Sequence, residues 1–353
     1  MNHELSEIRI IAKKETYPQL DFATIKNPWG HSPLLEKNQK RINSVSEDIL
    51  SQHVGEWLSI NPRSITLGAN GSTEIIDLIP QLFIPSDNPC IMITPTYFGL
   101  HESLKKTGHL IIEIQTDPET GFTYNDTVIK NLFRESKNRC PSLIWFCSPN
   151  NPTGVVMDLD VIDHIAKMNP DTLIVVDEAY QEIVDPTNKN SMIHRINTLK
   201  NVLITKTFSK TWGLPEIKIG IAIGNEALVN KIQRNNVRPA INKKSLILAE
   251  AALLDIDHLN KTHTRIKDEL SYMKTHVSAM NHISFGSDSQ TGVCILRHDK
   301  AHLGEALKKR NIQSLDCNQI KGLEGLGYIR IGLQTHEKNK QFISHLWQLD
   351  SQL

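Results

Sequence analysis

The feature that most constrains the fold is a regular alternation of short apolar runs with longer stretches of helical periodicity between residues 65 and 224. This alternation is typical of a parallel sheet with helices on both faces, because parallel neighbours need long crossover connections. The runs expected to form strands are 65–68, 90–93, 143–146, 173–176, 202–205 and 219–223. We therefore predict an α/β fold whose large domain contains a mostly parallel, doubly wound sheet.

The pattern changes after residue 225. A long helical stretch through residue 253 and another over 258–280 precede short strands at 293–296 and 328–333 and a closing helix from Glu337. A chain of 353 residues is long enough for two cores. We expect a large domain over residues 36–232 and a smaller α/β domain formed by 1–35 and 233–353. In its N-terminal arm, residues 25–30 (IKNPWG) are expected to fold back over the cleft.

Composition excludes several classes of function. The 39 basic and 39 acidic residues balance, and neither sign forms a long block, so nucleic-acid and membrane-surface partners are not expected. The five cysteines lack paired spacing, which is typical of reduced thiols in a cytosol-like compartment. No apolar run has the length of a signal peptide or a membrane span. The sequence predicts a cytoplasmic protein that acts on small molecules, without a metal site.

Polar residues follow the ends of three predicted strands. Asp177 begins the segment DEAY, where a buried carboxylate can pair with a pyridine nitrogen and keep it protonated. Lys210, in TFSKTWGL (207–214), carries an amine that can form a Schiff base with an aldehyde. Asn151, in CSPNNPTG (147–154), can donate to a phenolate oxygen, with Tyr180 as a second donor. Each residue alone has an ordinary alternative, such as a surface lysine or a helix cap, but their common order favours pyridoxal 5′-phosphate.

The phosphate of such a cofactor needs a cradle of its own, and residues 68–73 (GANGST) have the required pattern. A strand ends there in a glycine turn, and Gly71, Ser72 and Thr73 open a helix whose free amides attract a dianion. Thr207 and Lys218 are expected to complete the cradle from the other side. The alternative is that Ser72 is an ordinary helix N-cap.

Three further residues are expected at the site. Tyr97 lies just past a strand and can stack on the cofactor ring, although it could equally pack in the core. Arg330, in GYIRIG (327–332), interrupts an apolar strand with a planar guanidinium that suits a substrate carboxylate; a solvent-exposed strand edge is the alternative. We expect Asn27 and Asn151 to contact the substrate together with Arg330.

Taken together, these segments resemble the fold-type I pyridoxal-phosphate aminotransferase superfamily, from about Asp21 to the C-terminus. Within it the chain looks most similar to the histidinol-phosphate aminotransferase and threonine-phosphate decarboxylase branches. The segments FCSPNNPTG, GLPEIK (213–218) and DCN (316–318) are more similar to the decarboxylases. The resemblance implies a homodimer with active sites at the interface.

The chain departs from these relatives at three places. Lys218 stands where the family usually has a phosphate-binding arginine, and it lacks the bidentate fork. Leu315 stands where both branches usually have an arginine. The tyrosine expected near residues 42–45, which in the family reaches the partner's cofactor phosphate, is absent. These departures put phosphorylated substrates in doubt.

The residues and the resemblance predict a class I/II aminotransferase that transfers an amino group between a small amino acid or amine and a 2-oxo acid. Lys210 would act as general base and acid, and Asp177 would maintain the electron sink. The alternative is a decarboxylase resembling threonine-phosphate decarboxylase, because the bond that breaks is the one perpendicular to the ring. A non-catalytic regulator is a third possibility, but no N-terminal DNA-binding extension is seen, and Lys210 and Asp177 are both present.

Overall fold

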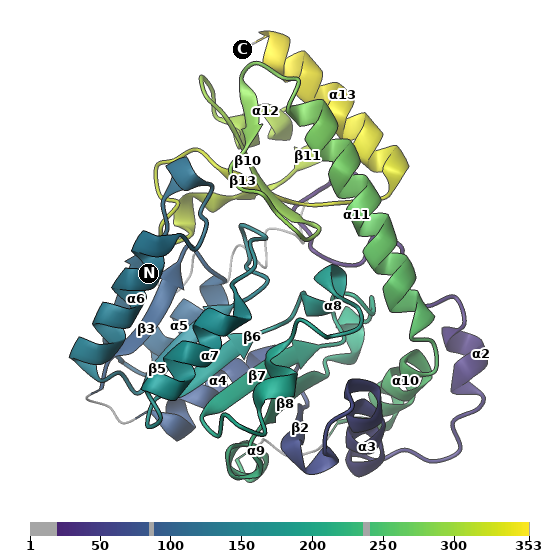
Figure 1. Cartoon of the computed structure of the whole chain (residues 1–353). Helices are drawn as coiled ribbons and strands as arrows, with labels where there is room; N and C mark the ends of the chain where they lie inside the picture. The colour runs from purple at the N-terminus through teal and green to yellow at the C-terminus, as the bar shows by residue number, and fades with distance from the viewer. Residues whose placement is uncertain (1–19, 85–87, 236–240, 353) are drawn as a thin grey trace.

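The computed structural model describes residues 20–84, 88–235 and 241–352. Figure 1 shows a large α/β layer structure below and a smaller α/β unit above. Helix α11 (Asp257–Val277) runs from one to the other along the side of the molecule. This arrangement places the carboxyl ends of the large sheet beneath the small unit.

The large sheet of the described residues has the strand order β2-β8-β7-β6-β5-β3-β4. Its strands are β2 (Ile65–Gly68), β3 (Cys90–Thr94), β4 (Ile111–Gln115), β5 (Leu143–Cys147), β6 (Leu173–Asp177), β7 (Val202–Thr207) and β8 (Gly220–Gly224). All strands expected from the sequence in this region are confirmed, whereas β4 was not expected. Strands β3 to β7 pair in parallel, but β8 runs antiparallel to β7 and to β2. A parallel return would need a long crossover, and the connection over 208–219 has only a short 3-10 turn.

Apolar layers cover both faces of this sheet, as expected for a doubly wound fold. Ile91 and Ile93 of β3 belong to one cluster with residues of α3, α6, α7 and α10, while Cys90 and Met92 belong to another with α4, α5 and α9. The helices of this part are α2 (Leu35–Gln39), α3 (Glu47–Leu58), α4 (Ser72–Phe83), α5 (Phe98–Lys106), α6 (Asp126–Arg139), α7 (Leu159–Met168), α8 (Gln181–Val184), α9 (Glu226–Gln233) and α10 (Lys243–Leu253). The strand order changes direction between β5 and β3, and ligands bind at such points in α/β sheets.

The small unit is an antiparallel sheet covered by two long helices. Its strand order is β12-β13-β10-β9, and α11 and α13 pack on it through one apolar cluster. The elements are β9 (Ile283–Phe285), β10 (Val293–His298), α12 (Leu303–Lys308), β12 (Leu315–Asp316), β13 (Ile329–Gly332) and α13 (His336–Gln352), together with a parallel pair formed by β1 (Leu20–Asp21) and β11 (Ile312–Gln313). The expected strands and closing helix are confirmed here.

The single helical stretch expected between residues 225 and 253 is wrong. Helix α9 ends at Gln233, and α10 starts again at Lys243 because the Asn242 side chain accepts from the Ser245 amide and caps a new helix. Residues 236–240 lie outside the described part of the chain. The division into domains at residues 35/36 and 232/233 stays a prediction.

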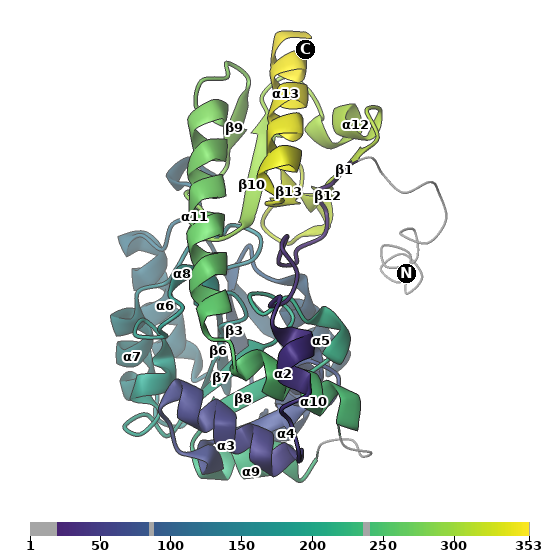
Figure 2. The same cartoon turned by 90° about the vertical axis from the view of Figure 1, so that its right-hand side faces the viewer.

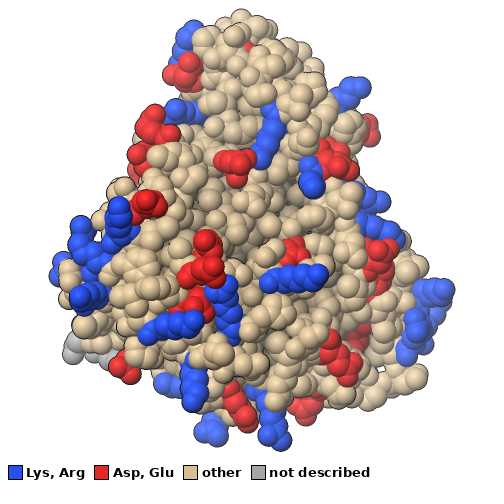
Figure 3. All heavy atoms as spheres, in the orientation of Figure 1, with Lys and Arg blue, Asp and Glu red and all other residues tan. Residues whose placement is uncertain are grey.

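Two surface properties bear on the expected partners. On the face shown in Figure 3, lysines and arginines are interspersed with aspartates and glutamates, and no broad patch of one sign is visible. Within the described ranges, no helix has the length and apolar character that a membrane crossing needs.

Candidate active site

A cavity of about 210 Å³ lies at the carboxyl ends of β5, β6 and β7. It is lined by Asn70, Gly71, Ser72, Thr73, Tyr97, Cys147, Asn151, Asp177, Ala179, Tyr180, Thr207, Ser209, Lys210, Pro215 and Lys218. Every residue expected to contact the cofactor is in this set. The sequence analysis missed Asn70, Cys147, Ala179, Ser209 and Pro215, whose only signal was that they neighbour the expected residues.

Asp177 ends β6 and is buried, with 4% of its surface exposed. Its Oδ1 accepts hydrogen bonds from Thr205 Oγ1 (3.0 Å) and from the Ala179 amide (3.3 Å). Burial outweighs these bonds and raises the pKa of Asp177 to about 6. Asp177 is not the N-cap of helix α8, because Tyr180 holds that position. A cationic group bound beside this carboxylate would stabilise its charged form.

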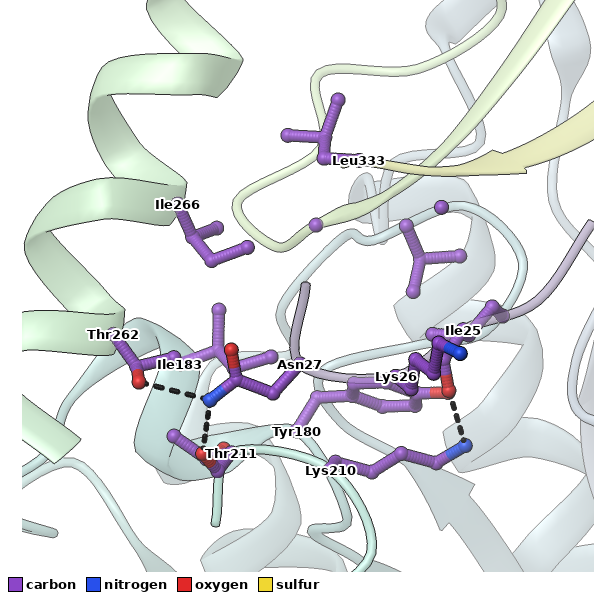
Figure 4. Close-up of a pocket in the computed structure, with 13 residues that line it drawn as sticks. Ile25, Lys26, Asn27, Tyr180, Ile183, Lys210, Thr211, Thr262, Ile266 and Leu333 are labelled. Carbon is purple, nitrogen blue, oxygen red and sulfur yellow. Dashed lines mark hydrogen bonds between the residues drawn. The ribbon is translucent and has the colours of Figure 1, made fainter. Parts of the chain in front are cut away.

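Lys210 lies on the loop after β7, and it is not a solvated surface lysine. Its Nζ donates to the Ile25 carbonyl (3.2 Å) and lies 5.4 Å from the centroid of the Tyr180 ring (Figure 4). Burial, and next the Arg330 charge, lower the pKa of Lys210, attraction to Asp177 partly offsets both, and the net result is a pKa of about 8. A large fraction of the amine is therefore neutral near pH 8, which makes Lys210 a competent nucleophile.

The expected phosphate cradle is built by close approach of two backbones. Gly71 has a φ of 73°, and its amide donates to the Lys218 carbonyl (2.5 Å). A Cβ on Gly220 would lie 2.4 Å from both Gly71 C and Ser72 N, so only glycine allows this approach. Gly71 is the N-cap of the 12-residue helix α4 and gives no side-chain cap, so Ser72 is not an ordinary N-cap. The N-terminus of α4 lines the cavity with Gly71, Ser72 and Thr73, and a helix N-terminus suits a dianion.

Asn151, Tyr180 and Tyr97 supply further polar and aromatic groups. Asn151 and Tyr180 are 6% and 3% exposed, and Asn151 Oδ1 accepts from Arg330 Nη1 (3.4 Å), which leaves the Asn151 NH₂ group to donate elsewhere. Tyr97 lines the cavity and packs edge-on against Phe98, with ring centroids 5.0 Å apart. Direct contacts of these three residues with the cofactor stay a prediction. An anion cradle, an amine and a carboxylate in one cavity nevertheless form a donor set that fits pyridoxal 5′-phosphate.

Arg330, on β13 of the small unit, does not line the cavity itself but contacts Asn151 at its wall. It is buried, so the solvent-exposed strand edge is excluded. Only 9% of its surface is exposed; Nη2 donates to the Ala23 carbonyl (2.7 Å), and the buried Nε has no hydrogen-bond partner. No carboxylate of the described chain forms an ion pair with it. Burial lowers the pKa of Arg330 because the charge is not compensated. The guanidinium is therefore suited to an anionic ligand.

Asn27 lies beside a second, smaller cavity that shares Lys210 and Tyr180 with the first (Figure 4). Its Nδ2 donates to the Thr211 carbonyl (2.8 Å) and to Thr262 Oγ1 (3.0 Å), and its Oδ1 accepts from the Trp29 amide (3.0 Å). Substrate contact by Asn27 stays a prediction, but the protein itself already uses these polar atoms.

Comparisons with known proteins agree with this geometry. The family model "Aminotransferase class I and II" matches residues 41–346. A histidinol-phosphate aminotransferase of Caldicellulosiruptor saccharolyticus is 33% identical over 267 residues, covering 72% of this chain and 71% of the relative. The structure of a histidinol-phosphate aminotransferase from Clostridium acetobutylicum has a TM-score of 0.83 at 22% identity, covering 95% of this chain and all of that one. The structure of L-threonine-O-3-phosphate decarboxylase from Porphyromonas gingivalis has a TM-score of 0.77 at 20% identity, covering 94% of this chain and all of that one.

Proposed function

The chain belongs to the aminotransferase class I and II family and is a pyridoxal-phosphate-dependent aminotransferase, and we propose that its amino donor is a small, non-phosphorylated amino acid. The acceptor is a 2-oxo acid. The observation that carries this proposal is the buried, unpaired Arg330 guanidinium beside the apolar Leu315.

Arg330 supplies one carboxylate site. A substrate carboxylate would provide the missing acceptor for Nε and an opposite charge for a cation that the fold leaves uncompensated. Asn151 and the Ala23 carbonyl hold the guanidinium in a fixed orientation. A carboxylate held in this way by Arg330 would be retained by a fixed cation during the reaction, which favours transamination over loss of carbon dioxide.

Leu315 makes the binding of a second anionic group of the substrate unfavourable. It is the register partner of Arg330 on the neighbouring strand β12, where an arginine would add another cation next to the first. A distal phosphate, as in the substrates named for the relatives, would meet an apolar side chain there and would lose hydration without a partner. A short, uncharged side chain has no such cost.

The protein's own groups have distinct tasks in this reaction. Pyridoxal 5′-phosphate, when bound, supplies an electron sink that stabilises negative charge at the substrate α-carbon. Asp177 keeps the proton on the ring nitrogen, and Lys210 removes and returns the proton at the substrate carbon. Thr205 orients the Asp177 carboxylate through its hydroxyl, 3.0 Å from Oδ1.

Product analysis tests the proposal. The loaded enzyme is incubated with a panel of neutral amino acids and a 2-oxo acid, and with threonine phosphate and histidinol phosphate, and the keto acids and carbon dioxide formed are measured. Keto acid formation from neutral donors is the expected result. Robust release of carbon dioxide from threonine phosphate without a keto acid would establish the decarboxylase alternative instead.

We further propose that the enzyme is a cytoplasmic homodimer. The support for the dimer is the resemblance to the superfamily, which implies one. The support for the compartment is the scattered, unpaired cysteines, of which Cys90, Cys147, Cys294 and Cys317 are buried. Light scattering of the cofactor-loaded protein should give twice the mass of the chain, and a monomer with full turnover would contradict the dimer.

A further inference from the structure

One stretch of backbone contacts both cations of the active site. We call residues 20–31 the strap; in Figure 2 the purple chain carries it from β1 in the small unit down to α2 on the large one. The Phe22 carbonyl accepts from the Gly332 amide (2.8 Å) and the Ala23 carbonyl from Arg330 Nη2 (2.7 Å). Two residues further on, the Ile25 carbonyl accepts from Lys210 Nζ (3.2 Å). The position of the strap therefore affects Arg330 and Lys210 together.

Asn27 fixes the strap to the rest of the protein. Its amide nitrogen has two protons, and these go to the Thr211 carbonyl (2.8 Å) and Thr262 Oγ1 (3.0 Å) (Figure 4). His258 Nε2 lies farther away, at 3.3 Å. Thr211 directly follows Lys210, whereas Thr262 and His258 belong to α11. Because Asn27 is 6% exposed, water cannot easily replace these bonds.

Close packing prevents the strap from shifting alone. A Cβ on Gly213 would lie 2.2 Å from the Gly30 carbonyl oxygen, so the strap rests directly on the loop that carries Lys210. On the outer side, the Arg265 guanidinium of α11 lies 5.4 Å from the centroid of the Trp29 ring. The strap is therefore held between the Lys210 loop and α11, and Asn27 bonds to both.

We propose that Asn27 is a positioning residue, which anchors the strap so that the Ala23 and Ile25 carbonyls hold the Arg330 guanidinium and the Lys210 amine at fixed positions relative to each other. A substrate bound through its carboxylate at Arg330 then presents its α-carbon to Lys210. Productive geometry of this kind depends on small displacements. The catalytic benefit rests on the proposed roles of Arg330 and Lys210, but the anchoring itself does not.

Loss of the Asn27 anchor should change the pKa of Lys210 in a definite direction. Burial is the largest cause that lowers the pKa of this amine, and the Arg330 charge is the next. A loosened strap admits water and lets Arg330 move, so both causes weaken, while the entering water replaces the Ile25 carbonyl as an acceptor for Lys210 Nζ. Asp177, which raises the pKa, and Lys218, which lowers it, are not bonded to the strap. The pKa of Lys210 should therefore rise from about 8.

The test compares Asn27→Ala with Asn38→Ala. Asn38 is a matched control because it is 3% exposed and its side-chain amide donates one hydrogen bond to the Ala251 carbonyl (3.1 Å), away from the strap. The pKa of the Lys210 amine is measured in cofactor-free protein by competitive acetic anhydride labelling and mass spectrometry. The pH midpoint of the visible absorbance is then measured after loading. We expect Asn27→Ala to raise both by about half a unit or more, and Asn38→Ala to lower only the melting temperature.

Thr262→Val provides a milder second variant, since it removes one acceptor of the Asn27 amide with little change of shape. It should shift the Lys210 pKa in the same direction by a smaller amount, and it decides the question if Asn27→Ala does not fold. Lower stability with an unchanged Lys210 pKa in both variants would overturn the proposal and leave Asn27 as a structural residue. Neither readout uses a substrate, so a wrong substrate proposal would not affect this result.

Discussion

Replacing Asp177 by asparagine should make the cofactor-free protein more stable at neutral pH while it destroys turnover. The amide oxygen can still accept the bonds from Thr205 and Ala179, so the substitution removes the charge and keeps the contacts. The pKa of Asp177 is raised from 3.8 to about 6 by burial. At 1.36 kcal/mol per unit, this shift corresponds to about 3 kcal/mol of unfolding free energy.

The direction in which stability changes with pH follows from how tightly the folded and unfolded states bind the Asp177 proton. The folded protein holds the Asp177 proton more tightly than the unfolded chain, so the contribution is fully present below pH 3.8 and is lost as the pH rises to about 6. Above that pH the parent carries the cost of a buried charge, and Asp177→Asn does not. The variant should therefore gain up to about 3 kcal/mol over the parent at pH 7.5, and much less at pH 4.5.

Urea unfolding of the cofactor-free proteins at both pH values measures the difference. Asp185→Asn is a control of opposite sign: although burial opposes it, hydrogen bonds from Thr187 and Asn190 lower the pKa of Asp185, so this variant should lose stability at neutral pH. In the loaded enzyme, Asp177→Asn should retain cofactor but lose turnover by about a hundredfold or more. Near-normal turnover would refute the assignment of Asp177 to the ring nitrogen, and no gain in stability at pH 7.5 would refute the cost assigned to its buried charge.

The other predictions concern single residues of the cavity and its surroundings. Lys210→Ala should abolish the borohydride-reducible cofactor adduct that peptide mapping otherwise finds at Lys210; a surviving adduct would contradict its role. Arg330→Ala should cost about 2–5 kcal/mol of transition-state stabilisation for carboxylate substrates, measured as a fall in kcat/KM. Amines that lack a carboxylate should be little affected. Lys218→Arg should slow cofactor loss on dialysis by about tenfold, because arginine binds phosphate bidentately. Leu315→Arg should give measurable turnover of phosphorylated amino acids. If the variant has no such turnover, a residue other than Leu315 excludes these substrates.

The buried strands of the large sheet could be predicted because parallel strands are covered on both faces and form continuous apolar runs. The edge strand β4 was missed because Glu113 interrupts its apolar run, as suits a strand in which only Ile114 is buried. The orientation of β8 depends on how the loop over 208–219 returns, which apolar content does not encode. Local pattern therefore identified the strands, and connection geometry decided how one of them pairs.

Apart from Lys218, which precedes β8, the expected cavity residues were predictable because they lie at or just after strand ends, and parallel strand ends meet at one edge of the sheet. The hydroxyl that orients Asp177 was not, because Thr205 becomes its neighbour only through the register between β6 and β7. The Ala23 and Ile25 carbonyls were equally out of reach. A backbone oxygen has no residue-specific signature, and the two partners are 307 and 185 positions away.

The charges of this protein separate into two kinds by their partners. Lys206 is as deeply buried as any site residue, yet Glu178 (3.0 Å) and Glu182 (2.9 Å) compensate it, and their attraction raises its pKa although burial alone would lower it. Arg330 and Asp177 are also buried, but burial moves their pKa values toward the neutral forms because the described chain leaves them without ion-pair partners. Because this fold pairs the buried cation Lys206 with two carboxylates, the absence of such a partner at Arg330 in the described chain is not a general property of its buried charges. The unpaired charges therefore support the ligands proposed for them, a cationic ring nitrogen beside Asp177 and a carboxylate at Arg330. Each ligand should bind more tightly because it supplies the opposite charge that the described chain does not.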